Sequence, residues 1–160
     1  CIRDSYDANT IGEGLNQRFL IKEQYLDTYF SLIMETTFED AEPENVVFIT
    51  EKVYQPMINY HPFMIAGNPG LLKQLRDDGF ATFPELFDES YDGIPAKSTR
   101  AKIILDQTIA WCKNHNYFIE KEQLINSSTI RDKLVHNRNH FINCDKRKKW
   151  QDLVDWIMLK

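Results

Sequence analysis

The fold is decided by Thr50-Glu51-Lys52 and, ten residues later, by Pro62-Phe63-Met64-Ile65-Ala66-Gly67-Asn68-Pro69-Gly70. The first stretch indicates a helix start, because the Thr50 hydroxyl can accept a hydrogen bond from an N–H of the first turn. The second stretch indicates a short buried strand and a glycine turn, with a proline near the start of another helix. A helix N-terminus carries unpaired N–H groups and partial positive charge. We therefore expect an anion-binding place at this helix start.

Outward from these stretches, apolar runs and helical spacings predict alternating strands and helices. The strand predictions are 29–34, the strand-like run 46–49, 63–66 and 80–83. The helix predictions are 13–27, 50–59, 71–79 and, beyond Pro95, helices that contain 103–111, parts of 124–140 and 150–159. Pro56 is expected to bend or shorten the second of these helices. This order indicates an α/β class with a parallel sheet, followed by a helical tail over 115–160.

Composition is typical of one folded domain of 160 residues, since 42% of the residues are apolar. No apolar run approaches the roughly 20 residues that cross a bilayer, so we expect no membrane span. The polar first residues give no secretory signal, and three widely spaced cysteines favour a reducing, cytoplasmic location. The start at Cys1 rather than at methionine indicates a fragment, a trimmed form or a mature product of a longer protein, and we favour the fragment.

Charge is uneven, because the first hundred residues are acidic and residues 101–160 are basic. The densest basic cluster is Lys146-Arg147-Lys148-Lys149. We interpret it as a solvated helix start, and the acidic remainder argues against a nucleic-acid partner.

Polar residues follow three of the apolar runs. Glu35 follows the first, Thr50-Glu51-Lys52 follows the second, and Gly67-Asn68 follows the third. The carboxyl ends of parallel strands meet at one edge of a sheet, where ligands bind. We therefore expect these residues to converge on one site.

Each candidate residue also has an interpretation without a ligand. Lys52 opposes the helix dipole, which a diphosphate would offset, but it could instead pair with Glu51, Glu35 or the acidic loop. Glu51 could accept sugar hydroxyls or only favour the dipole. Glu35 could line the site or cap a neighbouring turn, and Phe48 could stack on a base or belong to the core.

Further polar residues point less clearly to chemistry. Asp88-Glu89-Ser90-Tyr91-Asp92 is interpreted as a solvated turn rather than an acid–base pair or a calcium loop. Arg100 could hold a phosphate or pair with Asp92. The four histidines lack the context of a zinc site, so no metal is expected.

Several ordered motifs resemble the donor-binding half of the alpha-fucosyltransferases and of related microbial and viral glycosyltransferase-like proteins. They are Phe30-Ser31-Leu32-Ile33-Met34-Glu35-Thr36, Phe48-Ile49-Thr50-Glu51-Lys52, Pro62-Phe63-Met64-Ile65-Ala66-Gly67, Gly79-Phe80-Ala81-Thr82-Phe83, Asp88-Glu89-Ser90-Tyr91-Asp92 and His136-Asn137. The resemblance covers roughly residues 28–140.

This resemblance implies a GT-B architecture, in which two Rossmann-like domains face a cleft and the C-terminal one holds the nucleotide sugar. Lys52 would then hold the donor diphosphate and Glu51 the ribose hydroxyls. Phe48 stands where the fucosyltransferases usually have a tyrosine near the base, and Pro56 is a second departure. The N-terminal domain, with the proposed catalytic base and much of the acceptor site, is not in this sequence.

The sequence thus predicts the donor domain of a glycosyltransferase that moves a sugar from a nucleoside diphosphate, possibly GDP-linked, to an acceptor hydroxyl. The expected partners are a nucleotide sugar, a glycan or other hydroxyl acceptor and the missing N-terminal domain, with no separate cofactor. Two other interpretations remain open, namely a non-catalytic nucleotide-sugar binding module and a protein-interaction module.

Overall fold

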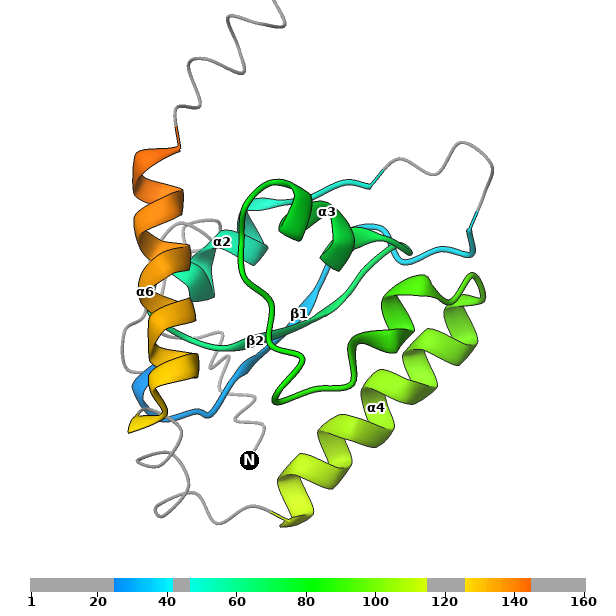
Figure 1. Cartoon of the computed structure of the whole chain (residues 1–160). Helices are drawn as coiled ribbons and strands as arrows, with labels where there is room; N and C mark the ends of the chain where they lie inside the picture. The colour runs from blue at the N-terminus through cyan, green and yellow to red at the C-terminus, as the bar shows by residue number, and fades with distance from the viewer. Residues whose placement is uncertain (1–24, 42–46, 115–125, 145–160) are drawn as a thin grey trace, which may run out of the picture.

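Two parallel strands lie at the centre of the described chain (Figure 1). The computed structural model describes residues 25–41, 47–114 and 126–144. Strand β1 spans Ser31–Met34 and β2 spans Phe63–Ala66, with Ser31 opposite Phe63 and Met34 opposite Ala66. The predicted strands 29–34 and 63–66 are therefore confirmed, and they pair in parallel. The described chain belongs to a mixed α/β class.

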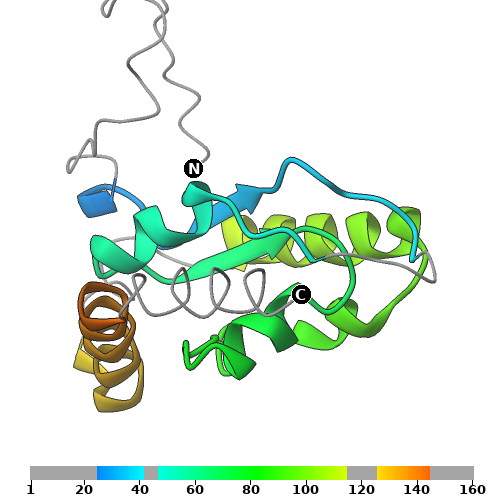
Figure 2. The ribbon, with the colours of Figure 1, turned by 90° about the horizontal axis from the view of Figure 1, so that it is seen from above.

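The remaining elements follow β1 and β2 along the chain. They are α2 (Glu51–Ile58), α3 (Leu71–Asp77), the 3-10 helix η1 (Glu89–Gly93), α4 (Lys97–Asn114) and α6 (Ser128–Asn143). Helix α6 lies along one side of the molecule against α2, and α4 lies on the other side against β2 and η1 (Figures 1 and 2). The predicted helices at 50–59, 71–79, 103–111 and within 124–140 are confirmed.

Two predicted strands are wrong. Residues 47–49 of the run 46–49 have no strand pairing, and residues 80–83 have none either. Several predictions fall outside the described residues, namely residue 46, helix 150–159, most of helix 13–27, and residues 115–125 and 145–160 of the tail. Of the predicted helix 13–27, the described residues Tyr25 and Leu26 are helical.

Helix α2 begins as the sequence predicts and ends in an unusual turn. Thr50 caps its start, and the Thr50 hydroxyl accepts a hydrogen bond from the Lys52 N–H. Pro56 lies within the helix, which continues to Ile58. After Asn59 the chain turns at Tyr60, whose φ of 52° is the left-handed conformation usually adopted there by glycine.

Helix α3 ends at the predicted glycine. The N–H of Gly79, at φ 90°, donates to the Arg76 carbonyl, and the N–H of Phe80 donates to the Leu75 carbonyl. These two bonds define a Schellman motif, which satisfies carbonyls that the helix end would leave unpaired. The motif sends the chain back towards α6.

The hydrophobic core fills the space between the sheet and the helices. Its buried members are Ile33, Val53, Met57, Phe63, Met64, Ile65, Ala66, Leu71, Leu72, Leu75, Phe80, Phe83, Phe87, Tyr91, Ile104, Ile130 and Leu134. All four side chains of β2 are buried, whereas β1 exposes Leu32 and Met34. None of the helices in the described part of the chain combines the length and apolar character needed to cross a bilayer.

Candidate functional site

Glu35 joins the end of β1 to the start of α2. Its side chain is buried, and its carboxylate accepts hydrogen bonds from the Thr50 N–H at 2.9 Å and from the Thr50 hydroxyl at 2.7 Å. The Thr36 N–H adds a third bond at 3.2 Å. Of the two interpretations of Glu35, the cap is therefore the one that the geometry supports. This buried carboxylate fixes the helix start at the carboxyl edge of the sheet.

Lys52 extends over that same edge. Its ammonium donates to the Thr36 hydroxyl at 3.4 Å and lies 3.8 Å from a carboxylate oxygen of Glu51. The Lys52 side chain is 38% exposed and that of Glu51 is 61% exposed, so their ion pair is weak. The amine thus remains available beside the helix start, next to a threonine that sequence reasoning did not single out. The one feature of the sequence that could have pointed to Thr36 is its position directly after Glu35.

Phe48 is not part of the core. Its side chain is 56% exposed, although it lies in the apolar run before Thr50. The core interpretation of Phe48 is therefore wrong, and its ring is accessible to a flat partner.

Gly67 and Asn68 lie at the end of β2, beside the end of β1. A Cβ at Gly67 would lie 2.5 Å from the Leu71 Cδ1, so the buried Leu71 side chain would have to shift to admit a larger residue here. The Asn68 side-chain oxygen accepts a hydrogen bond from the Glu39 N–H at 2.9 Å. Asn68 therefore positions the acidic loop that follows β1.

Arg100 lies apart from the other candidates, inside the fold. Only 1% of the residue is exposed, and its guanidinium donates to the carbonyls of Ile94, Pro95 and Glu39. Burial lowers the pKa of Arg100. Neither predicted role of Arg100 holds in this arrangement. Its guanidinium bonds main-chain oxygens, and it is neither exposed to a phosphate nor paired with Asp92. It fixes the same acidic loop that Asn68 holds.

The acidic motif 88–92 is not the solvated turn that the sequence suggests, because Glu89 is half-buried and Asp92 is buried, although Asp88 and Ser90 are exposed. The buried Asp92 carboxylate accepts hydrogen bonds from the N–H groups of Leu72 and Lys73, both at 2.9 Å, and so caps α3. Glu89 accepts from the Phe83 N–H at 2.7 Å and from Arg76 at 2.9 Å. Burial is the main cause that raises the pKa of Glu89.

The His136-Asn137 pair also holds backbone. The Asn137 amide accepts from the Ala81 N–H at 2.7 Å and donates to the Ala81 carbonyl at 2.9 Å. His136 donates to the Gly79 carbonyl, and His140 donates to the Asp78 carbonyl. These side chains replace the neighbouring strand that residues 80–83 were expected to have.

The histidines and carboxylates do not gather into a metal-ligand set. Among residues 25–41, 47–114 and 126–144, no three His, Cys, Asp or Glu side chains lie close enough to hold an ion together. His61 bonds Thr28 and Ser31, and His115 is outside these ranges.

The structure thus brings seven of the eight candidates to the segments at the carboxyl edge of the sheet, namely Glu35, Phe48, Thr50, Glu51, Lys52, Gly67 and Asn68. It leaves only Arg100 in a supporting position. Comparisons with protein-family models, with curated proteins and with solved structures find no match to the chain.

Proposed function

We propose that this chain is the donor-binding domain of a glycosyltransferase, with a Rossmann-like, GT-B type architecture completed by a second domain. The observation that carries the proposal is the Lys52 ammonium, which lies at the start of α2 and reaches Thr36 at the end of β1. A diphosphate bound there would contact both the ammonium and the positive end of the helix.

The neighbouring residues support the same ligand. Glu51 is exposed in the first turn and offers a carboxylate to ribose hydroxyls. Phe48 offers an exposed ring to a base. The buried Glu35 takes up the Thr50 N–H and hydroxyl, so it holds the helix start in place without occupying the solvent side of Lys52.

In the reaction that this site would support, an acceptor hydroxyl attacks the anomeric carbon of the donor sugar, and the nucleoside diphosphate departs from that carbon. Negative charge develops on the leaving diphosphate, and Lys52 together with the helix start would stabilise that charge. The base that removes the acceptor proton would come from the second domain.

Isothermal titration calorimetry with GDP, UDP, ADP and CMP tests the proposal on the chain as it is. We expect one nucleoside diphosphate to bind, and Lys52→Ala to weaken that binding about tenfold or more, the usual consequence of losing a charge-assisted hydrogen bond. Lys73→Ala is the matched control, because Lys73 also lies in the first turn of a helix but pairs with Asp77. A folded protein that binds none of the four nucleotides contradicts the proposal.

The exposed apolar side chains of β1 favour a second candidate, a protein-interaction module. Leu32 is 38% exposed and Met34 is 57% exposed on a strand whose partner strand is buried. In that case Lys52→Ala would leave every nucleotide titration unchanged, whereas Met34→Asp would abolish binding of a protein partner to β1. The nucleotide titration therefore separates the two candidates.

A further inference from the structure

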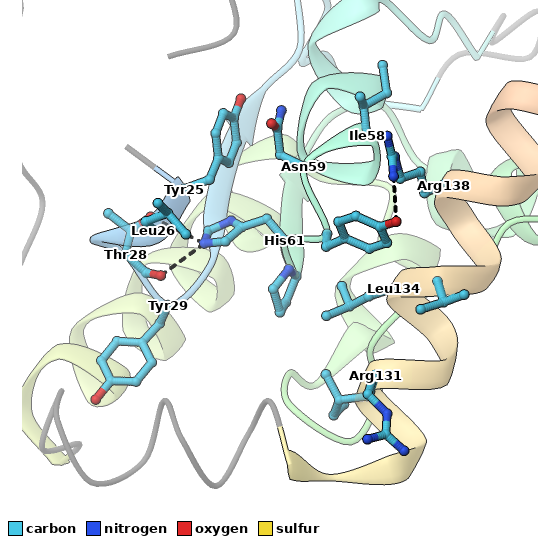
Figure 3. Close-up of a pocket in the computed structure, with 14 residues that line it drawn as sticks. Tyr25, Leu26, Thr28, Tyr29, Ile58, Asn59, His61, Arg131, Leu134 and Arg138 are labelled. Atoms are coloured by element: carbon cyan, nitrogen blue, oxygen red, sulfur yellow. Dashed lines mark hydrogen bonds between the residues drawn. The ribbon is translucent and has the colours of Figure 1, made fainter. Parts of the chain in front are cut away.

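A cavity lies at the edge of the sheet opposite the proposed donor site, before the strands begin. It has a volume of about 480 Å³ and is formed by residues preceding β1 and β2, the end of α2 and one face of α6 (Figure 3). Volumes of this size are typical of sites for small organic molecules. It shares no residue with the proposed donor site at the carboxyl edge.

The α6 face of the cavity is apolar in its middle and cationic at both ends. Arg131, Leu134, Val135 and Arg138 follow the i, i+3, i+4, i+7 spacing of one helical stripe, and all four line the cavity. The described residues that line the cavity include no aspartate or glutamate. The described part of the lining therefore combines apolar side chains with two arginines and no carboxylate.

Arg138 brings a positive charge to this site. Its guanidinium lies over the Tyr60 ring, 4.7 Å from the ring centre, and donates to the Tyr60 hydroxyl (Figure 3). Its Nε–H is buried and has no hydrogen-bond acceptor among the described residues. Because Nε is closed off, an anion in the cavity would meet the terminal nitrogens of this half-buried side chain.

Tyr60 is held here at a conformational cost. It adopts φ 52° after the end of α2, where glycine would be unstrained. Its ring lines the cavity beneath Arg138, and its hydroxyl, which accepts from Arg138, keeps its own proton to donate. Strain of this kind is found where a side chain is needed in one place.

We propose that this cavity binds a small amphipathic carboxylate, with its apolar body between α2 and α6 and its carboxylate at Arg138 and Tyr60. The arginine supplies the charge and its terminal N–H groups, the tyrosine supplies an O–H, and Leu134 and Val135 contact the apolar body. Binding here requires neither Lys52 nor a nucleotide, so it stands or fails independently of the donor site.

Three ligands with one apolar body test the charge preference, namely 4-phenylbutyrate, 4-phenyl-1-butanol and 4-phenylbutylamine. By titration calorimetry and ligand-observed NMR, we expect the carboxylate to bind about tenfold or more tightly than the alcohol, and the amine not to bind. Arg138→Met keeps the apolar stem and removes the charge, so it should bring carboxylate and alcohol to nearly equal affinity. Equal affinity of the two in the unaltered protein would overturn the proposal.

Two further variants test the location. Val135→Trp, on an exposed part of α6, should fill the cavity and abolish binding, whereas Asn139→Trp on the same helix lies outside the lining and should leave binding unchanged. Tyr60→Gly suits the backbone and should fold while losing carboxylate binding. Binding that survives in both Val135→Trp and Tyr60→Gly, or no binding of 4-phenylbutyrate to the folded wild-type chain, refutes the assignment.

Discussion

Replacing Asn137 by alanine should remove the contact that takes the place of a strand beside Ala81. Asn137 is 1% exposed and makes two hydrogen bonds to that one residue, at 2.7 and 2.9 Å. The replacement leaves a backbone N–H and a carbonyl of Ala81 without their partner, and it creates a small cavity. The effect should therefore exceed the loss of an ordinary surface hydrogen bond.

The magnitude follows from the two groups left unpaired. A buried donor or acceptor that loses its partner costs about 1–3 kcal/mol. Ala81 is half-buried, so water can reach part of its backbone and the lower half of that range applies to each group. We expect the free energy of unfolding to fall by about 2–4 kcal/mol, a large share of the 5–15 kcal/mol typical of a domain.

Urea denaturation followed by tryptophan fluorescence measures this loss, and Asn137→Asp sharpens the test. The introduced carboxylate still accepts a hydrogen bond from the Ala81 N–H, but its second oxygen faces the oxygen of the Ala81 carbonyl. Two acceptors in contact repel each other, whereas a protonated carboxyl can donate to the carbonyl. The pKa of the introduced carboxyl should therefore rise on folding. A raised pKa in the folded state means that stability is gained as pH falls. The difference from wild type should therefore shrink between about pH 7 and pH 4.

Two results would contradict this reasoning. One is an Asn137→Ala variant that loses less than about 0.5 kcal/mol, the range of an inert surface change. The other is an Asn137→Asp variant whose deficit relative to wild type does not depend on pH.

Three further changes test the packing around the site. Gly79→Ala should cost about 1–3 kcal/mol, since φ is 90° and the new Cβ would lie 2.9 Å from the His140 ring, whereas Gly93→Ala has open space and should be nearly neutral in the same thermal melts. Glu35→Ala should cost about 2–4 kcal/mol in urea and Glu35→Gln clearly less, because only alanine removes every acceptor; equal losses would argue against the capping role. Burial raises the pKa of Glu89 in the folded state, so the Glu89 carboxyl stabilises the fold most at a pH below its pKa in the unfolded chain, and this stabilisation is lost as pH rises through its pKa in the folded state. Wild type should therefore gain stability relative to Glu89→Gln on acidification from about pH 7 to pH 4. The opposite slope would refute this assignment.

Local patterns were sufficient where each element carries its own signals. Thr50 before a charged first turn, and Gly79 after an apolar face, fixed the start of α2 and the end of α3 within a residue or two. The two strands that pair were marked by apolar runs that end in polar residues or glycine. The convergence at the carboxyl edge followed from parallel pairing, which the register of β1 and β2 confirms.

Patterns failed where the partner of a segment is distant in the sequence. Residues 80–83 have the composition of a short strand, but the partner of Ala81 is the side chain of Asn137, 56 residues later. The run 47–49 is as apolar as a strand, yet Phe48 faces solvent. Nothing local distinguishes a carboxylate in water from one that caps a helix, as Asp92 does.

The capping of α3 by Asp92 has a consequence for local unfolding of this part of the molecule. The Asp92 carboxylate holds the amides of Leu72 and Lys73, and its carbonyl holds that of Gly70, so the first turn of α3 cannot fray unless η1 also detaches. Deuterium uptake at these three amides should therefore proceed at one common rate, set by the opening of a unit that runs from the end of β2 to η1.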